Sequence, residues 1–273
     1  MSQIEKVKKA YDERAETYDK AFDKNFYKIF DVITWKYLEP YLPKNKDAVV
    51  LDAGGGTGRW SIPIAKKGLN VVLIDISDGM LNAARRKIKE AGLEEKITLK
   101  QGDITKLEYP DETFDLVVCE HALVFIEEKA KAIQELARVL KKGSPIIISI
   151  PNIYTDILMS IKHDFPQHID MAIGIMNGSL TTITKDDERK LKGLKAQSLA
   201  PIEFRKMLEE NGLKVEKIVG KVVTMQGMPE MFIAETDMSQ DLLQKLLKIE
   251  TTLCERDDAS GLAAHLQAIA YKK

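Results

Sequence analysis

The feature that most constrains this chain is a regular alternation between short apolar runs and longer segments with helical spacing. Within each short run the apolar side chains occupy successive positions, as they do in strands that are covered on both faces of a sheet. Runs of this kind, separated by helical segments, are typical of α/β proteins with a parallel sheet. The candidate strands lie at residues 49–51, 71–74, 97–99, 116–118 and 146–148.

The segments between these strands have the features of helices. A glycine follows each predicted helix, and glycine commonly ends a helix in a left-handed conformation. The predicted helices cover residues 60–67, 78–91 and 127–142, and the glycines are Gly68, Gly92 and Gly143. Outside this region we expect a helix that stops at Pro40, helices over 201–210 and near 242–254, and strands near 215–223 and 266–271.

The pattern loosens on both sides of residues 48–151, which we predict to be the core of the domain. Residues 1–47 are expected to form helices that lie against the core or over its top edge. Residues 152–199 are too long for an ordinary connection and are predicted to be an inserted lid. The remainder of the core would follow in residues 200–273, with a second insertion at about 224–261.

The composition bounds the partners of the chain. Its 41 Lys and Arg against 42 Asp and Glu supply no net positive charge, so we expect no general affinity for nucleic acid. Cys119 and Cys254 are too few for a disulfide framework or a zinc cluster. No apolar run approaches the roughly 18 residues of a membrane span. We expect a cytoplasmic protein without membrane insertion or a metal, and its oligomeric state stays open.

The most informative segment joins the first strand to the first of these helices. Gly54, Gly56 and Gly58 allow the backbone to turn sharply and to approach a ligand without interference from a Cβ atom. Glycine loops of this kind bind dinucleotides as well as other adenosine cofactors. In this chain Arg59 stands where the dinucleotide pattern G-x-G-x-x-G has its third glycine.

Acidic residues at the ends of the candidate strands indicate which of these cofactors the loop binds. Asp52, Asp75, Asp103 and Glu120 lie at or shortly after the ends of four successive strands, which line one crevice in a parallel sheet. A pyrophosphate beside Asp52 would be repelled, whereas a sulfonium cofactor with an ammonium group would be attracted. The electrostatics therefore favour S-adenosylmethionine.

Two of these acids suit particular groups of that cofactor. Asp75 offers two acceptor oxygens to the vicinal hydroxyls of the ribose, and Asp103 can accept from the adenine amino group. Ile76, Met80 and Ile104 supply apolar surfaces for the ring. Alternatives remain for two residues, because Asp75 is also placed as a helix cap and Glu120 as a solvated loop residue.

These residues resemble the class I S-adenosylmethionine-dependent methyltransferases, and within them the branch near the ubiquinone/menaquinone-biosynthesis methyltransferases. The resemblance covers residues 48–151, through the glycine loop, Asp75, Gly102-Asp103-Ile104 and residues 114–121. It extends to residues 11–19, 201–212 and 270–272. It implies a Rossmann-like three-layer sandwich with a seven-stranded, mostly parallel sheet, its last strand antiparallel, and helical lid insertions.

The resemblance also implies that the N-terminal helices cover the cofactor. Tyr18 would then contact the cofactor, although Tyr11 and Tyr18 are also spaced for ordinary packing on one face of a helix. The predicted cofactor-binding residues are Tyr18, Asp52, Ala53, Gly54, Gly56, Gly58, Asp75, Ile76, Met80, Asp103, Ile104 and Glu120.

His121 is the candidate catalytic residue. It follows the fourth strand beside the expected methyl position, and an imidazole suits a general base, although a packed histidine at a strand end has the same pattern. Cys119 lacks the preceding proline of the cytosine methyltransferases. His163 and His168 are a possible metal pair, but their spacing favours a solvated lid.

We expect transfer of a methyl group to an N, O or C atom of a small molecule. Met225, Met228 and Met231 would face the lid across an apolar pocket, which predicts a substrate with a hydrophobic portion. Two alternatives remain: a methyltransferase that acts on tRNA or protein, and a non-catalytic domain that binds S-adenosylmethionine as a sensor or partner.

Overall fold

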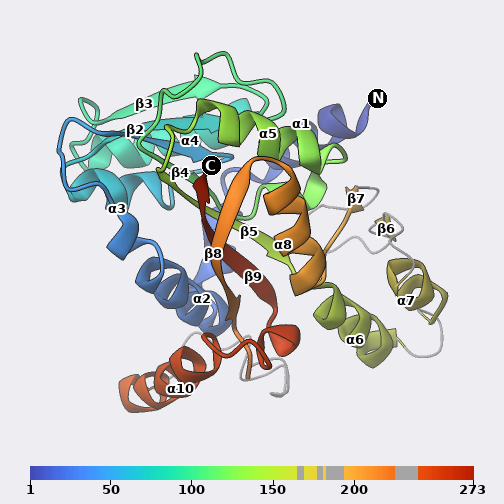
Figure 1. Cartoon of the computed structure of the whole chain (residues 1–273). Helices are drawn as coiled ribbons and strands as arrows, with labels where there is room; N and C mark the ends of the chain where they lie inside the picture. Colours follow the sequence, from blue (N-terminus) through green and yellow to red (C-terminus); the bar gives the residue numbers. More distant parts are fainter. Residues whose placement is uncertain (165–168, 177–180, 183–193, 225–238) are drawn as a thin grey trace.

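The computed structural model describes residues 1–164, 169–176, 181–182, 194–224 and 239–273 (Figure 1). His168 and the three methionines of the predicted acceptor pocket lie outside these residues. Parts of the predicted lid and of the second insertion also lie outside them. Inside the predicted lid, the structure describes helices α6 (Ile153–Asp164) and α7 (Ile169–Met176) and the short strands β6 (Thr181–Thr182) and β7 (Lys195–Ala196).

A seven-stranded sheet forms the centre of the molecule, with the strand order β3-β2-β1-β4-β5-β9-β8. Strand β9 is antiparallel to both of its neighbours, and the other strands are parallel to one another. The predicted fold class is therefore confirmed, including the antiparallel last strand. The strands are β1 (Val49–Ala53), β2 (Asn70–Asp75), β3 (Ile97–Gln101), β4 (Leu116–Cys119), β5 (Pro145–Pro151), β8 (Leu213–Lys221) and β9 (His265–Lys272).

Helices cover both faces of this sheet, which makes a three-layer structure (Figure 1). Successive strand residues alternate between the two layers: Val50 and Val118 pack on one side, and Leu51 and Val117 on the other. The first side is covered by α2 (Asn25–Lys36), α3 (Ser61–Lys66), α4 (Asp78–Glu90) and α10 (Gln240–Leu253). The second is covered by α5 (Lys129–Val139) and α8 (Pro201–Glu210).

Two predicted elements end earlier than the sequence pattern suggested. Helix α5 stops at Val139 because Leu140 has an extended backbone and pairs with Phe114 beside the sheet. Strand β8 stops at Lys221 because Val222 has a φ of +59°, a conformation that a β-branched residue rarely adopts. At the end of α5 a contact with the sheet therefore overrides an apolar run that continues in the sequence.

Helix α1 (Gln3–Arg14) packs against the beginning of α4. The carboxylate of Asp12 accepts hydrogen bonds from the Ser77 hydroxyl at 2.6 Å and from the Gly79 amide at 2.9 Å. A Cβ atom at Gly79 would lie only 2.9 Å from the Asp12 backbone, so glycine permits this approach. Lys8 adds an ion pair with Asp78. The N-terminal helix is therefore fixed beside the end of β2.

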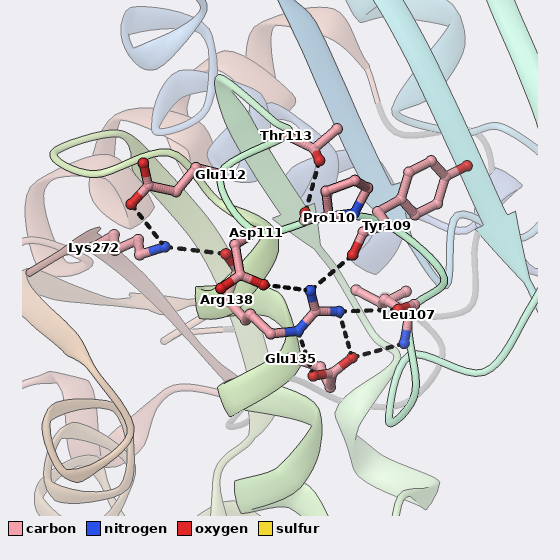
Figure 2. A network of polar contacts seen from close by, with 9 residues as sticks. All are labelled: Leu107, Tyr109, Pro110, Asp111, Glu112, Thr113, Glu135, Arg138 and Lys272. Atoms are coloured by element: carbon pink, nitrogen blue, oxygen red, sulfur yellow. Dashed lines mark hydrogen bonds and ion pairs between the residues drawn. The ribbon is translucent and has the colours of Figure 1, made fainter.

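The loop between β3 and β4 is held by Arg138 of helix α5, which stands at the centre of Figure 2. Its guanidinium donates to the backbone carbonyls of Leu107 and Tyr109 and to the carboxylates of Asp111 and Glu135. Glu135 in turn accepts from the Leu107 amide at 2.9 Å. These contacts anchor the loop whose first residues line the site described next.

Within the described residues, no helix is both long and apolar enough to span a membrane.

Candidate functional site

A cavity of about 420 Å³ lies at the carboxyl ends of the parallel strands. Its walls come from the loop after β1, the ends of β2 and β4, the segment after β3, the beginning of α5, and helix α1. The structure thus brings most of the predicted site residues together. Those that line the cavity are Tyr18, Gly54, Gly56, Asp75, Ile76, Met80, Asp103, Ile104, Glu120 and His121.

The glycine loop depends on the absence of side chains. Gly54 has a φ of +74°, and a Cβ atom there would lie 2.5 Å from the Cβ atom of Ala122. Gly56 has a φ of +55°. The amides of Gly54 and Gly55 both donate to the Ile74 carbonyl, at 2.7 and 3.1 Å, which ties the loop to β2. The loop therefore presents backbone to the cavity at a fixed position.

Asp75 at the end of β2 is held by backbone donors. Its two carboxylate oxygens accept from the amides of Gly56 and Ser77, each at 2.9 Å. Burial raises the pKa of Asp75 from its ordinary 3.8 to about 6. Each oxygen retains a second lone pair, so the carboxylate can still accept hydrogen bonds from a ligand in the cavity. The Ser77 hydroxyl, and not Asp75, caps α4 by accepting from the Met80 amide.

Asp52, Ala53 and Gly58 do not line the cavity. The Asp52 carboxylate lies under the loop, where it accepts from the Ser61 hydroxyl at 2.6 Å and is 1% exposed. Burial raises its pKa to about 7. Asp52 therefore supports the loop from below, and its expected attraction for a sulfonium cofactor would act through the loop. A binding role for these three residues stays a prediction.

Asp103 and Ile104 line the cavity on the side of β3. The Asp103 carboxylate accepts from the Thr105 amide at 2.8 Å, which fixes the side chain at the start of the loop. Ile104 is 6% exposed and packs in the core layer that contains α5. The Arg138 network holds the following residues of this loop (Figure 2).

Glu120 is not a solvated loop residue. Its carboxylate accepts from the Lys221 ammonium at 2.6 Å, and the side chains of the two residues are 1% and 0% exposed. Lys221 also donates to the Thr34 hydroxyl at 3.2 Å. Sequence reasoning missed Lys221, because its partner lies 101 residues away. The available signal was a lysine inside the apolar run of residues 218–223.

His121 lies at the cavity wall and is also packed. Its φ is +61°, and its amide donates to the Ser149 hydroxyl at 3.1 Å. The centroid of its ring lies 4.6 Å from that of Phe30 and 4.5 Å from that of His265. Burial holds the pKa of His121 well below its ordinary 6.5, and His265 contributes. The imidazole is therefore neutral at pH 7, and burial opposes its protonation, so a general-base role for His121 stays a prediction.

Aromatic side chains close the cavity on the side of α1. Tyr11 lies with its ring centroid 6.1 Å from those of Tyr18 and Phe125. The guanidinium of Arg14 lies 4.8 Å from the centroid of the Tyr18 ring. Helix α1 ends at Arg14, and Tyr18 begins the separate 3₁₀ helix η1 (Tyr18–Asp23). The two tyrosines thus meet across a turn.

Neither cysteine has the features of a nucleophile. Cys119 and Cys254 are both buried, and burial raises the pKa of each thiol. Within the residues that the structure describes, no group of three or more His, Cys, Asp or Glu side chains is placed to hold a metal ion.

Residues 50–143 match the family model of a methyltransferase domain. The phosphatidylethanolamine N-methyltransferase of Cereibacter sphaeroides is 41% identical over 99 residues, which cover 36% of this chain and 48% of that protein. The demethylmenaquinone methyltransferase of Bacteroides fragilis is 32% identical over 147 residues, which cover 53% of this chain and 57% of that protein. The ubiquinone/menaquinone biosynthesis C-methyltransferase of Hydrogenovibrio crunogenus is 33% identical over 169 residues, covering 59% and 65%. The match thus spans less than two thirds of each of these relatives.

Solved structures show the same fold over more of the chain. A putative S-adenosylmethionine-dependent methyltransferase from Listeria monocytogenes has a TM-score of 0.61 at 20% identity, covering 89% of this chain and 99% of that one. An S-adenosylmethionine-dependent methyltransferase from Thermotoga maritima, a possible histamine N-methyltransferase, has a TM-score of 0.60 at 17% identity, covering 97% and 99%. The resemblance found in the sequence is therefore confirmed: residues 50–143 match a methyltransferase domain, and the chain is similar to S-adenosylmethionine-dependent methyltransferases.

Proposed function

We propose that this chain transfers the methyl group of S-adenosylmethionine to an N, O or C atom of a small molecule. The observation that carries the proposal is the cavity at the strand ends, which joins the glycine loop, Asp75 and Asp103 in one wall. This wall belongs to the residues that match the methyltransferase domain. One structural neighbour, the magnesium protoporphyrin IX methyltransferase from Synechocystis, carries bound S-adenosylhomocysteine, with a TM-score of 0.51.

The residues of the cavity fit the parts of this cofactor. The free lone pairs of Asp75 suit the two ribose hydroxyls, and Asp103 suits the adenine amino group. Ile76, Met80 and Ile104 provide apolar surface for the ring. Glu120 would then lie nearer to the sulfonium end, with its carboxylate already paired with Lys221.

Catalysis would depend mainly on position. The sulfonium group makes the methyl carbon electrophilic when the cofactor is bound, and the protein orients the acceptor for an in-line displacement. Tyr11 of helix α1 and Tyr18 of η1 cover the cavity and would exclude water during transfer. The N-terminal residues 1–47 are therefore proposed as the cover of the cofactor site.

The acceptor is proposed to have a hydrophobic portion. Ile4, Val7, Phe125 and Ile126 contribute apolar side chains to the wall of the cavity. The names of two relatives contain phosphatidylethanolamine and demethylmenaquinone, each of which has a long apolar part. A small molecule with an apolar part is thus the acceptor class that both observations support.

A labelling experiment tests this proposal. The protein and methyl-labelled S-adenosylmethionine are incubated with one fraction of a cell extract at a time. The three fractions are small molecules, RNA and protein. Label is expected in the small-molecule fraction and should be reduced in Asp75→Ala when the cofactor is limiting. Label in the RNA or protein fraction would replace the proposal by methylation of a macromolecule. Binding of the cofactor without transfer to any fraction would favour a non-catalytic domain.

A further inference from the structure

The first residue of helix α1 joins two segments that are far apart in the sequence. The side-chain nitrogen of Gln3 donates to the Lys195 carbonyl at 2.8 Å, and the side-chain oxygen accepts from the Lys195 amide at 3.3 Å. The same nitrogen also donates to the Phe125 carbonyl at 3.5 Å. Gln3 therefore pairs with the backbone of Lys195 as a residue of a neighbouring strand would, and its side chain also belongs to the wall of the cavity.

The partner of Gln3 belongs to a segment that supports the cavity wall, residues 194–197, which we call the supporting segment. Leu194 is 2% exposed and packs in one apolar cluster with Phe125, which lines the cavity. The Gln197 amide donates to the Val124 carbonyl at 3.0 Å. A shift of the supporting segment would therefore disturb the wall that is proposed to hold the apolar part of the acceptor.

Helix α1 connects this joint to the cofactor side of the cavity. A capping box fixes its first turn, because the Ser2 hydroxyl accepts from the Glu5 amide at 3.3 Å and the Ser2 amide donates to the Glu5 carboxylate at 2.7 Å. Near the other end of the helix, Asp12 is hydrogen-bonded to the beginning of α4. Gln3 and Asp12 are about 14 Å apart along the helix axis, at about 1.5 Å per residue. Tyr11 lies between them and lines the cavity.

A helix that is fixed at both ends transmits a restraint from one end to the other. A cofactor that contacts α1 from inside the cavity restrains the helix, and the pairing of Gln3 with Lys195 passes this restraint to the supporting segment. An acceptor that binds afterwards meets a wall that is already ordered, so it loses less conformational entropy. Coupling between two ligands is reciprocal, so the acceptor should strengthen cofactor binding by the same factor.

We propose that Gln3 is a positioning residue that couples the cofactor site to the acceptor site. The cofactor holds α1, Gln3 holds the supporting segment, and this segment holds Phe125 against the apolar part of the acceptor. This inference rests on the proposed function. It names the contact through which a bound cofactor raises the affinity of the protein for an acceptor with an apolar part.

Hydrogen exchange of the full chain, followed by NMR with and without S-adenosylhomocysteine, tests the coupling without an acceptor. In the wild type we expect S-adenosylhomocysteine to slow exchange at the amides of Lys195 and Gln197 about fivefold or more. Gln3→Ala should lose this effect, while exchange in the glycine loop still slows. Gln3→Glu keeps an acceptor for the Lys195 amide and should retain part of the effect. Lys6→Ala, at an exposed position of the same helix, is the matched control and should behave as the wild type does.

Transfer from methyl-labelled S-adenosylmethionine to the small-molecule fraction of a cell extract gives a second measurement. In a dilution series of this fraction, Gln3→Ala should need about five times as much of it to reach half of the maximal rate. The turnover number should stay within about twofold of the wild type, since the change removes no group that acts on the reacting atoms. The affinity for S-adenosylhomocysteine, measured without an acceptor, should also stay within about twofold.

Three results would overturn this inference and leave the proposed function intact. The first is wild-type protein in which S-adenosylhomocysteine does not slow exchange at Lys195 and Gln197. The second is a slowing that persists unchanged in Gln3→Ala, and the third is a loss in that variant that is confined to the turnover number. No transfer by the wild-type protein to any fraction would overturn the proposed function and this inference together.

Discussion

At the scale of single residues, two aspartates at the ends of neighbouring strands have different roles in the site. Asp52 and Asp75 both end a buried strand, and burial raises the pKa of both carboxyls. Asp52 is satisfied by Ser61 beneath the loop, whereas Asp75 faces the cavity with backbone donors behind it. The sequence pattern placed both acids at one sheet edge but did not distinguish their directions, which depend on the path of the glycine loop.

Asp75→Ala should weaken the binding of S-adenosylhomocysteine at least about tenfold. Each charge-assisted hydrogen bond to a ribose hydroxyl is worth about 1.5–3 kcal/mol, and the variant removes the acceptor of both. Isothermal calorimetry gives the affinity directly. Glu90→Gln, an exposed carboxylate at the end of α4, is the control and should bind as the wild type does. Unchanged affinity in Asp75→Ala would remove the ribose assignment.

Asp52 predicts a pH dependence of stability. Its pKa is about 7 in the folded protein and near 3.8 when unfolded, so the folded state holds the proton more tightly. The contribution of this residue to the free energy of unfolding should therefore fall as the pH rises from about 4 to about 7, by as much as ~4 kcal/mol. Urea unfolding at several pH values should show a smaller fall in Asp52→Asn than in the wild type. Parallel curves would contradict the prediction.

At the scale of elements, apolar spacing predicted most of the sheet because its strands are buried on both faces. The five parallel strands that the sequence indicated are all present. The ion pair between Glu120 and Lys221 had no local signal of its own, since it joins β8 to the end of β4 across 101 residues. Periodicity reports what an element buries, but contacts between distant elements depend on the assembled sheet.

Helix α1 should loosen from α4 when Asp12 is changed to Ala. The change removes the acceptor of the Ser77 hydroxyl and of the Gly79 amide. Amides of α1 should then exchange hydrogen faster, and S-adenosylhomocysteine should dissociate faster because α1 covers the cavity. The control is Glu13→Ala at the next residue of the helix, which forms an ion pair with Lys9 of the same helix. Equal exchange in the two variants would show that this cap does not hold the helix.

The Arg138 network should contribute more to the free energy of unfolding than the partial exposure of the Arg138 side chain suggests. Its guanidinium makes five hydrogen bonds to the loop and to α5, a geometry that lysine cannot reproduce (Figure 2). Arg138→Lys should lower the free energy of unfolding by about 1–2 kcal/mol, because water replaces part of the lost bonds. Lys206→Ala, which removes an exposed ion pair on α8, should change it by less than about 0.5 kcal/mol in the same urea titration.

At the scale of the whole molecule, the site is assembled from segments that are far apart in the sequence. The cavity is lined by helix α1, the loop after β1, the ends of β2 and β4, and the beginning of α5. Behind it, Lys221 of β8 pairs with Glu120, and Phe30 of α2 packs against His121. A fold prediction needs only the spacing within each segment. The cavity depends in addition on how the segments are placed relative to one another. This is why the positions of His265 and Lys221 near it could not be predicted from the sequence.

The cofactor should stabilise the whole domain because it bridges these segments. A ligand that binds only the folded state at a hundred times its dissociation constant adds about 2.7 kcal/mol to the free energy of unfolding. S-adenosylhomocysteine at that ratio should therefore raise the melting temperature by roughly 5–10 °C in a domain of this size. NAD at the same concentration should produce no shift, since Arg59 replaces the third glycine of the dinucleotide loop. A larger shift with NAD than with S-adenosylhomocysteine would refute the assignment of the cofactor, and Asp75→Ala at equal ligand concentration separates specific binding from a general solvent effect.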